Sequence, residues 1–270
     1  MNWIKKTGMM LVVAMMLASC FFMEYYTYQS QETLMQMQER EDEKQEKVVS
    51  GAVIENEEKK ETEAKKIAYL TFDDGPSKVT ERILDVLKVY DVQATFFLIG
   101  QNITSEREEL VKQMVEDGNA IGIHTYCHEA KEIYCSADAY MEDLEKTEDR
   151  IYEVTGENTK LCRFPWGSAN QYLKNIEEEL IPRMESQGYY YCDWNVSAED
   201  SVGTPTKYSI IKNVKKDYTR YEKPVILMHD SATSSLTAEM LPDIIVMLKS
   251  SGYQFDTLDH VEKPYQYPRN

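Results

Sequence analysis

Residues 67–76 read IAYLTFDDGP, an apolar run that stops at two acids and a turn. Short runs of aliphatic and aromatic residues that end at turn residues are typical of buried β-strands. The turn residues here are Gly75 and Pro76. The stretch therefore predicts a buried strand, Ile67–Phe72, with Asp73 and Asp74 in the loop that leaves its C-terminal end.

The rest of the chain repeats this pattern, with short apolar runs alternating with longer amphipathic ones in the manner of βα units. Further strands are expected at Ala94–Ile99, Ala120–Ile123, Leu161–Phe164, Tyr189–Asp193, Val225–Met228 and Phe255–Leu258. Helices are expected at Val79–Tyr90, Ser105–Asp117, Ala137–Thr155, Tyr172–Gln187, Tyr208–Tyr221 and Ala238–Ser250. This alternation favours an α/β fold, a single distorted (β/α) barrel that is complete or incomplete, over an open doubly wound sheet.

The N-terminus has the features of an export signal. Lys5 and Lys6 precede an apolar stretch that ends at Met23, which is the order of a positive n-region and an apolar h-region. The sequence LASC at 17–20 fits the site at which bacterial lipoproteins are cut and acylated on the cysteine, here Cys20. An uncleaved membrane helix is an equal alternative, and full secretion is a third. We therefore expect the rest of the chain at the extracytoplasmic face of the cell membrane or in the cell wall.

Composition divides the chain into four parts. The signal or membrane-anchor segment, 1–23, is followed by a stretch rich in Glu, Gln and Lys, 24–65, which is too polar to fold alone and is expected to be a charged flexible stalk. Residues 66–261 form one domain of ordinary size, and 262–270 are expected to be a C-terminal tail.

The charge of the chain limits its partners. With 47 acidic and 30 basic side chains, the formal net charge is −17. Such a chain repels polyanions, which argues against nucleic acid and against attraction to anionic lipid heads. We expect membrane contact through the N-terminal segment only, and a monomeric catalytic domain.

Four cysteines lie in the expected domain, at Cys127, Cys135, Cys162 and Cys192. Outside the cell they are either free thiols or joined in one or two disulfides. None of them forms a CxxC pair, which argues against a structural zinc site.

Chemically active side chains follow five of the expected strands. The C-terminal ends of parallel strands are where α/β barrels gather their catalytic residues. The side chains at these ends are Asp73 with Asp74, His124, Arg163, Asp193 and His229. Each of these motifs alone has a structural explanation, such as a polar turn or a hydrogen-bonded histidine, but together they predict one active site.

A metal centre is the first component of that site. His124 and His128 are spaced i,i+4, which on a helical turn would place both imidazoles on one face, close enough to share a metal. Of the adjacent Asp73 and Asp74, one can bind the cation while the other stays free as a base. Two histidines and one aspartate suit zinc, and cobalt, nickel or manganese accept similar ligands.

The remaining motifs supply groups for acid–base chemistry. Arg163 can hold a catalytic carboxylate by a bidentate contact, and the backbone N–H groups of the turn after it can face a developing oxyanion. His229, at the rim of the barrel, suits a general acid, and Asp193 can hold its other ring nitrogen.

In this order, the motifs resemble the polysaccharide deacetylases of carbohydrate esterase family four, the NodB-homology domain, and among them the peptidoglycan N-acetylglucosamine deacetylases. The resemblance covers about 66–258. The motifs that carry it are TFDDGP at 71–76, HTYCH at 124–128, RFPWG at 163–167, DW at 193–194 and LMH at 227–229.

The resemblance implies a role for each matching residue. It implies that Asp74, His124 and His128 hold a divalent metal, that Asp73 is the base that deprotonates the attacking water, and that His229 is the general acid.

The same resemblance implies supporting roles for further residues. Arg163 would orient the base, and Asp193 would tune the acid. Trp194 and Leu227 would form the pocket for the acetyl methyl group, and the backbone N–H of Trp166 would stabilise the oxyanion.

The expected function is hydrolysis of N-acetyl groups on a cell-wall aminosugar polymer, with peptidoglycan N-acetylglucosamine as the favoured substrate. Chitin oligomers, N-acetylmuramic residues and O-acetylated xylan are alternatives. A non-catalytic polysaccharide-binding lipoprotein on the same fold is the rival from another class, and the presence of Asp73, Arg163 and His229 argues against it. A metallopeptidase would usually show HExxH, which is absent from the sequence.

Overall fold

The computed structural model describes residues 66–269. The predicted export signal, the lipidation site at Cys20 and the stalk therefore lie outside the described residues. Within 66–269, no helix is both long enough and apolar enough to cross a membrane. The four cysteines of this part are all free thiols, two buried, one partly buried and one exposed.

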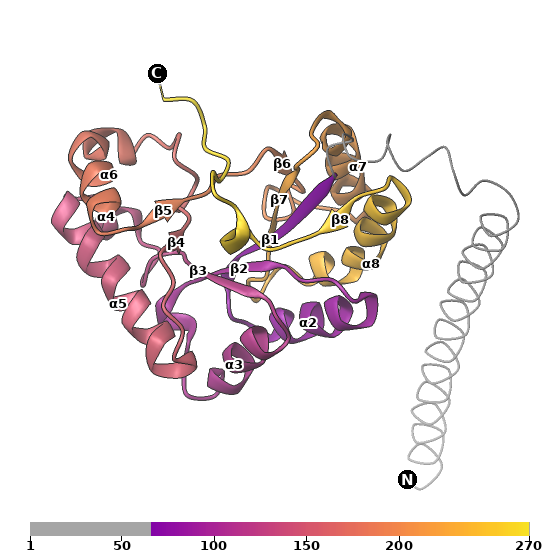
Figure 1. Cartoon of the computed structure of the whole chain (residues 1–270), viewed down its shortest axis with the longest axis horizontal. Helices are drawn as coiled ribbons and strands as arrows, with labels where there is room; N and C mark the ends of the chain where they lie inside the picture. The colour runs from indigo at the N-terminus through magenta and orange to yellow at the C-terminus, as the bar shows by residue number, and fades with distance from the viewer. Residues whose placement is uncertain (1–65, 270) are drawn as a thin grey trace, which may run out of the picture. The chain divides into compact units, whose positions relative to one another are not determined.

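A curled, parallel sheet forms the centre of the molecule, and helices lie around its outside (Figure 1). Its strands follow the spatial order β5-β4-β3-β2-β1-β7-β6, and β8 pairs with the beginning of β1. The strands are β1 (Ile67–Gly75), β2 (Thr95–Leu98), β3 (Ala120–Ile123), β4 (Leu161–Cys162), β5 (Tyr190–Tyr191), β6 (Val196–Ser197), β7 (Val225–His229) and β8 (Gln254–Phe255). Because β5 and β6 end this order, the sheet is a half-barrel, and the incomplete form of the predicted barrel is confirmed.

Six longer helices cover the sheet: α2 (Lys78–Tyr90), α3 (Glu108–Glu116), α5 (Ala137–Thr155), α6 (Glu177–Ser186), α7 (Lys207–Asp217) and α8 (Ser235–Ser250). The prediction of Ala137–Thr155 is confirmed to the residue. The helix predicted to begin at Tyr172 begins five residues later, after a 3₁₀ turn at Leu173–Asn175. The short β6 and the single-turn α4 (Ala130–Ile133) were not predicted, because segments of two to four residues carry too little periodicity.

The central strand β1 is buried on both faces. Leu70 and Phe72 pack into the main core with the helices, whereas Tyr69 belongs to a smaller core with Phe97 and Leu161. Side chains alternate between the faces of a strand, and a parallel sheet covered on both sides reads as a continuous apolar run. The uninterrupted run in the sequence therefore follows from the central position of β1.

The C-terminal residues pack against the domain. The backbone N–H of Asp193 donates to the carbonyl of Tyr265 at 2.7 Å, and the side chain of Gln266 donates to the carbonyl of Tyr191 at 3.0 Å. Arg269 donates to the hydroxyl of Tyr191 at 3.2 Å. Up to residue 269, the segment that we expected to be a C-terminal tail is therefore tied to the chain around β5.

Candidate active site and metal centre

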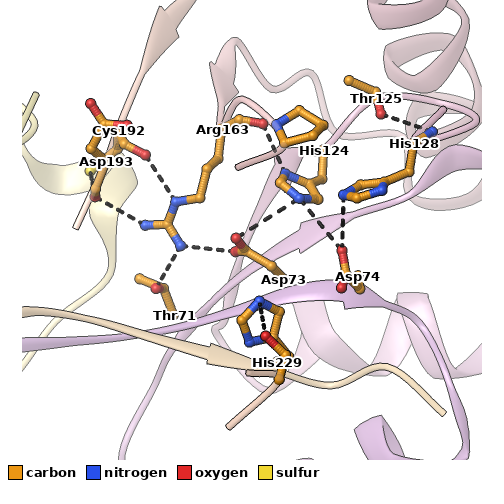
Figure 2. A network of polar contacts seen from close by, with 12 residues as sticks. Thr71, Asp73, Asp74, His124, Thr125, His128, Arg163, Cys192, Asp193 and His229 are labelled. Carbon is orange, nitrogen blue, oxygen red and sulfur yellow. Dashed lines mark hydrogen bonds and ion pairs between the residues drawn. The ribbon is translucent and has the colours of Figure 1, made fainter. Parts of the chain in front are cut away.

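Strand register brings the sequence motifs together. Asp73 on β1 is aligned with His229 on the adjacent β7. On the other side of β1, His124 directly follows β3, and Arg163 directly follows β4. The C-terminal ends of parallel strands meet at one edge of a sheet, and Figure 2 shows the four side chains converging there. The structure therefore brings these four side chains together, and their roles stay predictions.

Three side chains form a candidate metal centre. The Oδ1 atom of Asp74 lies 3.5 Å from Nε2 of His124 and 3.5 Å from Nε2 of His128. One ligand atom from each of these residues lies within 4.8 Å of the others. Asp74 has a φ of 76°, a backbone conformation that Asp adopts more readily than most residues.

The helical turn predicted for the two histidines is wrong. His124 and His128 lie in the loop between β3 and α4, where Thr125 has a φ of 68° and His128 has a φ of 58°. The Oγ1 atom of Thr125 accepts a hydrogen bond from the backbone N–H of His128 at 3.2 Å. Two left-handed residues turn this loop back on itself, so the imidazoles meet through loop geometry, with ring centroids 5.1 Å apart.

The donor set fits a divalent cation. Among the described residues, the buried Oδ1 of Asp74 has no hydrogen-bond partner, which is costly for a buried carboxylate oxygen unless something binds it. Nδ1 of His124 lies 2.8 Å from the carbonyl of Arg163. A carbonyl can only accept, so Nδ1 carries the proton and the lone pair of Nε2 is directed toward Asp74. Burial lowers the pKa of His124, which favours the neutral form that binds metals.

Arg163 positions Asp73. Its side chain is fully buried, and Nη1 donates to Oδ1 of Asp73 at 2.8 Å and to the hydroxyl of Thr71 at 2.7 Å. The other nitrogens donate to the backbone carbonyls of Cys192 and Asp193 at 2.9 Å and 3.2 Å. The contact with Asp73 therefore uses one nitrogen, whereas we predicted a bidentate pair. This arrangement leaves Oδ2 of Asp73 directed toward the candidate metal ligands, 3.9 Å from Nε2 of His124.

Asp200, and not Asp193, holds His229. Oδ1 of Asp200 lies 2.8 Å from Nδ1 of His229, and Oδ2 accepts the backbone N–H of His229 at 2.8 Å. Burial alone would lower the pKa of His229, but the hydrogen bond and charge of Asp200 outweigh it and, with the charges of Asp73 and Asp74, raise the pKa to about 9. Asp200 lies in a polar loop between β6 and α7, and no pattern in the sequence marks it.

Asp193 has a different role from the one predicted. Its buried carboxylate accepts the backbone N–H of Ser168 at 2.8 Å, the hydroxyl of Ser168 at 2.5 Å and the backbone N–H of Tyr267 at 2.8 Å. Asp193 therefore ties the loop after Arg163 to the C-terminal segment, and the predicted contact with His229 is corrected.

Comparison with known proteins identifies the family. A family model described as polysaccharide deacetylase matches residues 60–183. The putative polysaccharide deacetylase YheN of Bacillus subtilis is 34% identical over 203 residues, which cover 74% of this chain and 69% of that protein. A peptidoglycan-N-acetylglucosamine deacetylase of Bacillus cereus is 34% identical over 197 residues, which cover 71% of this chain and 69% of that protein. The chain belongs to the polysaccharide deacetylase family.

The fold agrees with this assignment. The crystal structure of the catalytic domain of peptidoglycan N-acetylglucosamine deacetylase from Eubacterium rectale superposes with a TM-score of 0.70 at 31% sequence identity. The match covers 82% of this chain and 98% of that domain. The sequence-based resemblance is thereby confirmed.

The residues expected to contact the acetyl group each neighbour a polar residue of the candidate site: Trp166 lies next to His128, Trp194 next to Arg163, and Leu227 opposite Thr71. Trp166 has a φ of 64° and a side chain that is 49% exposed, and its ring centroid lies 4.8 Å from that of His128. Trp194 packs over Gly167, where an added Cβ would come within 2.8 Å of its ring. Leu227 on β7 is 7% exposed. The roles of Trp166, Trp194 and Leu227 toward substrate stay predictions.

Asp230, a further buried acid that we did not predict, supports the C-terminal end of β1. Asp73 and Asp74 belong to this strand and not, as we had predicted, to the loop after it. Its backbone N–H donates to the carbonyl of Asp73 at 3.0 Å, and its carboxylate accepts the hydroxyl of Thr80 at 2.5 Å. A Cβ at Gly75 would lie 2.1 Å from Oδ2 of Asp230. Burial raises the pKa of Asp230 to about 7. Gly75 is therefore required for this close approach.

Proposed function

We propose that this polysaccharide deacetylase is a metal-dependent enzyme that hydrolyses N-acetyl groups on a cell-wall aminosugar polymer and releases acetate. The observation that carries the proposal is the pairing of Asp73 with His229 in the register of β1 and β7, next to the triad Asp74, His124 and His128. Peptidoglycan N-acetylglucosamine is the proposed substrate, supported by relatives and a structural neighbour that bear that name.

The chemistry of the substrate explains why each group is needed. An N-acetyl amide is a poor electrophile with a poor leaving group, so its hydrolysis requires an activated carbonyl, a base and an acid. A divalent cation held by Asp74, His124 and His128 would supply Lewis-acid activation. We propose zinc, with cobalt, nickel and manganese as alternatives.

The residues of the chain move the protons. Oδ1 of Asp73 is engaged by Arg163, so Oδ2 takes the proton from the attacking water. His229, protonated and held through Nδ1 by Asp200, gives the proton on Nε2 to the leaving nitrogen as the carbon–nitrogen bond breaks. The backbone N–H of Trp166 is proposed to stabilise the oxyanion.

The proposed location is the extracytoplasmic face of the membrane. The export signal and the charged stalk of the sequence support it, with a lipidated Cys20 or an uncleaved helix as the anchor. The catalytic domain is proposed to act as a monomer.

Acetate release tests the function. The full chain in detergent micelles would be incubated with N-acetylglucosamine oligomers and with purified peptidoglycan, each with chelator and then with added zinc. We expect acetate from peptidoglycan that is lost with chelator and restored by zinc. Acetate release from the oligomers but not from peptidoglycan would show that the proposed substrate is wrong and that the oligomers are substrates. Binding of the polymer without any acetate release would favour a binding protein on this fold.

A further inference from the structure

A cavity of about 280 Å³ adjoins the metal centre. Asp74 and His128 line one part of it, and Asn102, Arg107 and Ser231 line others. This volume is below the range of about 300–1,000 Å³ that is typical of pockets for drug-sized ligands. The cavity therefore suits a substituent or part of a sugar unit that continues from the group bound at the metal centre.

Arg107 differs from every other arginine of residues 66–269. The other six, Arg82, Arg150, Arg163, Arg183, Arg220 and Arg269, each form an ion pair with an aspartate or glutamate. Within the same part of the chain, no carboxylate lies within ion-pair distance of Arg107. Acidic side chains are abundant in this chain, whose net charge is −17. Arg107 nevertheless has no acidic partner within 66–269 and lines the cavity at the candidate active site, so its guanidinium is available to an external anion.

Hydrogen bonds through Asn102 connect Arg107 to the C-terminal end of β1. Its Nη1 donates to the carbonyl of Asn102 at 3.1 Å, and Nδ2 of Asn102 donates to the carbonyl of Asp74 at 2.9 Å. Asn102 thus connects the arginine to the backbone of a metal ligand. A guanidinium has five N–H donors in a planar fork, and one bond to a carbonyl leaves the others for a carboxylate, whose two oxygens match that fork.

We propose that Arg107 forms an anion subsite that binds a carboxylate on the sugar next to the one that is deacetylated. The inference rests on the proposed function and narrows its substrate class, because an N-acetylglucosamine homopolymer carries no carboxylate. In a peptidoglycan strand the anion is either the lactyl carboxylate of a sugar without its peptide or a carboxylate of the stem peptide.

The test compares one glycan with and without its charge. The full-length enzyme, loaded with zinc, would be assayed for acetate release on peptide-free glycan strands with free lactyl carboxylates, on the same strands after methyl esterification, and on strands that keep their stem peptides. We expect wild-type kcat/KM to be about tenfold higher for a carboxylate-bearing strand than for the ester, equivalent to about 1.4 kcal/mol, which is within the range of a charged hydrogen bond.

Variants assign that preference to Arg107. Arg107→Gln should remove the preference through KM, and Arg107→Lys, which keeps the charge without the fork, should retain part of it. Arg82→Gln on α2, where Arg82 pairs with Glu239, is the matched control and should keep the full preference. Circular dichroism would verify that each variant is folded.

The possible results separate the two proposals. A preference for peptide-free strands would identify the lactyl carboxylate, and a preference confined to peptide-bearing strands would identify the stem peptide. Wild-type activity with a preference that survives in Arg107→Gln, or with no preference at all, would overturn the subsite alone. No acetate from any substrate would overturn the proposed function, and the subsite with it.

Discussion

Asp73 and His229 stand opposite each other in the parallel register of β1 and β7. One is held by a buried arginine through Oδ1, and the other by a buried aspartate through Nδ1. A base and an acid on neighbouring strands can act on the two sides of one amide, because the strand pairing that creates the core also sets their separation.

Replacement of the base should separate catalysis from metal binding. Asp73→Asn keeps an oxygen for Arg163 but cannot take a proton, so we expect a loss of acetate release by a factor of about 10²–10⁴ with the metal content unchanged. His124→Ala should lose both acetate release and metal, because it removes a proposed metal ligand. Metal analysis of the purified variants measures metal binding, and acetate release measures catalysis. Near wild-type activity in Asp73→Asn would show that another group is the base.

The alkaline limit of activity should depend on Asp200. His229 must be protonated to act as the acid, and its pKa is raised to about 9 by Asp200 against the opposing effect of burial. Activity should therefore fall as pH rises toward 9, and a bound cation nearby shifts this limit downward. Asp200→Asn removes the charge, so the limit should move to lower pH.

Asp193→Asn is the matched control for that experiment. The carboxylate of Asp193 contacts Ser168 and Tyr267 rather than His229, so the alkaline limit in the profile of kcat against pH should stay in place. A shift in Asp193→Asn that equals the shift in Asp200→Asn would contradict the assignment of Asp200.

The C-terminal segment should contribute to activity. Deletion of 264–270 removes the N–H of Tyr267 from Asp193, and it exposes the ring of Trp194, which packs against Tyr267 with centroids 5.5 Å apart. We expect a loss of about 1–3 kcal/mol in the free energy of unfolding and a lower kcat. Urea unfolding and acetate release measure the two effects. Asp259→Asn, at an exposed position, serves as the control, and a deletion no more harmful than this change would show that the segment is dispensable.

Gly75→Ala should damage the end of β1 that carries Asp74. The new methyl group would overlap the carboxylate of Asp230, and overpacking of this kind costs about 1–3 kcal/mol. Both thermal stability and metal affinity should fall, because Asp74 precedes this position. In Gly75→Ala/Asp230→Ala the clash is gone, so part of the stability lost in Gly75→Ala should return. If the double variant lost as much stability as the two single variants together, this would argue against a direct overlap between the new methyl group and the carboxylate of Asp230.

Local patterns in the sequence predicted much of the domain. The run at 67–72 indicated a buried strand, and the helix at Ala137–Thr155 was correct at both ends. The helix is long and periodic, whereas the strand is a short continuous apolar run, and the burial of apolar side chains determines both. The motifs at strand ends were also predictable, because parallel strands place their C-terminal ends at one edge whatever the details of the fold.

Contacts between distant segments could not be predicted in the same way. Asp193 and Asp200 are both acids that follow short strands, and only the tertiary structure shows that Asp200 reaches His229 while Asp193 reaches Ser168 and Tyr267. The histidines share a site through left-handed loop residues and not through a helix. The sequence by itself determined which chemical groups this deacetylase has and at which edge of the sheet they gather. Their partners were decided by the tertiary structure, because hydrogen bonds depend on loop geometry that leaves no periodic trace in the chain.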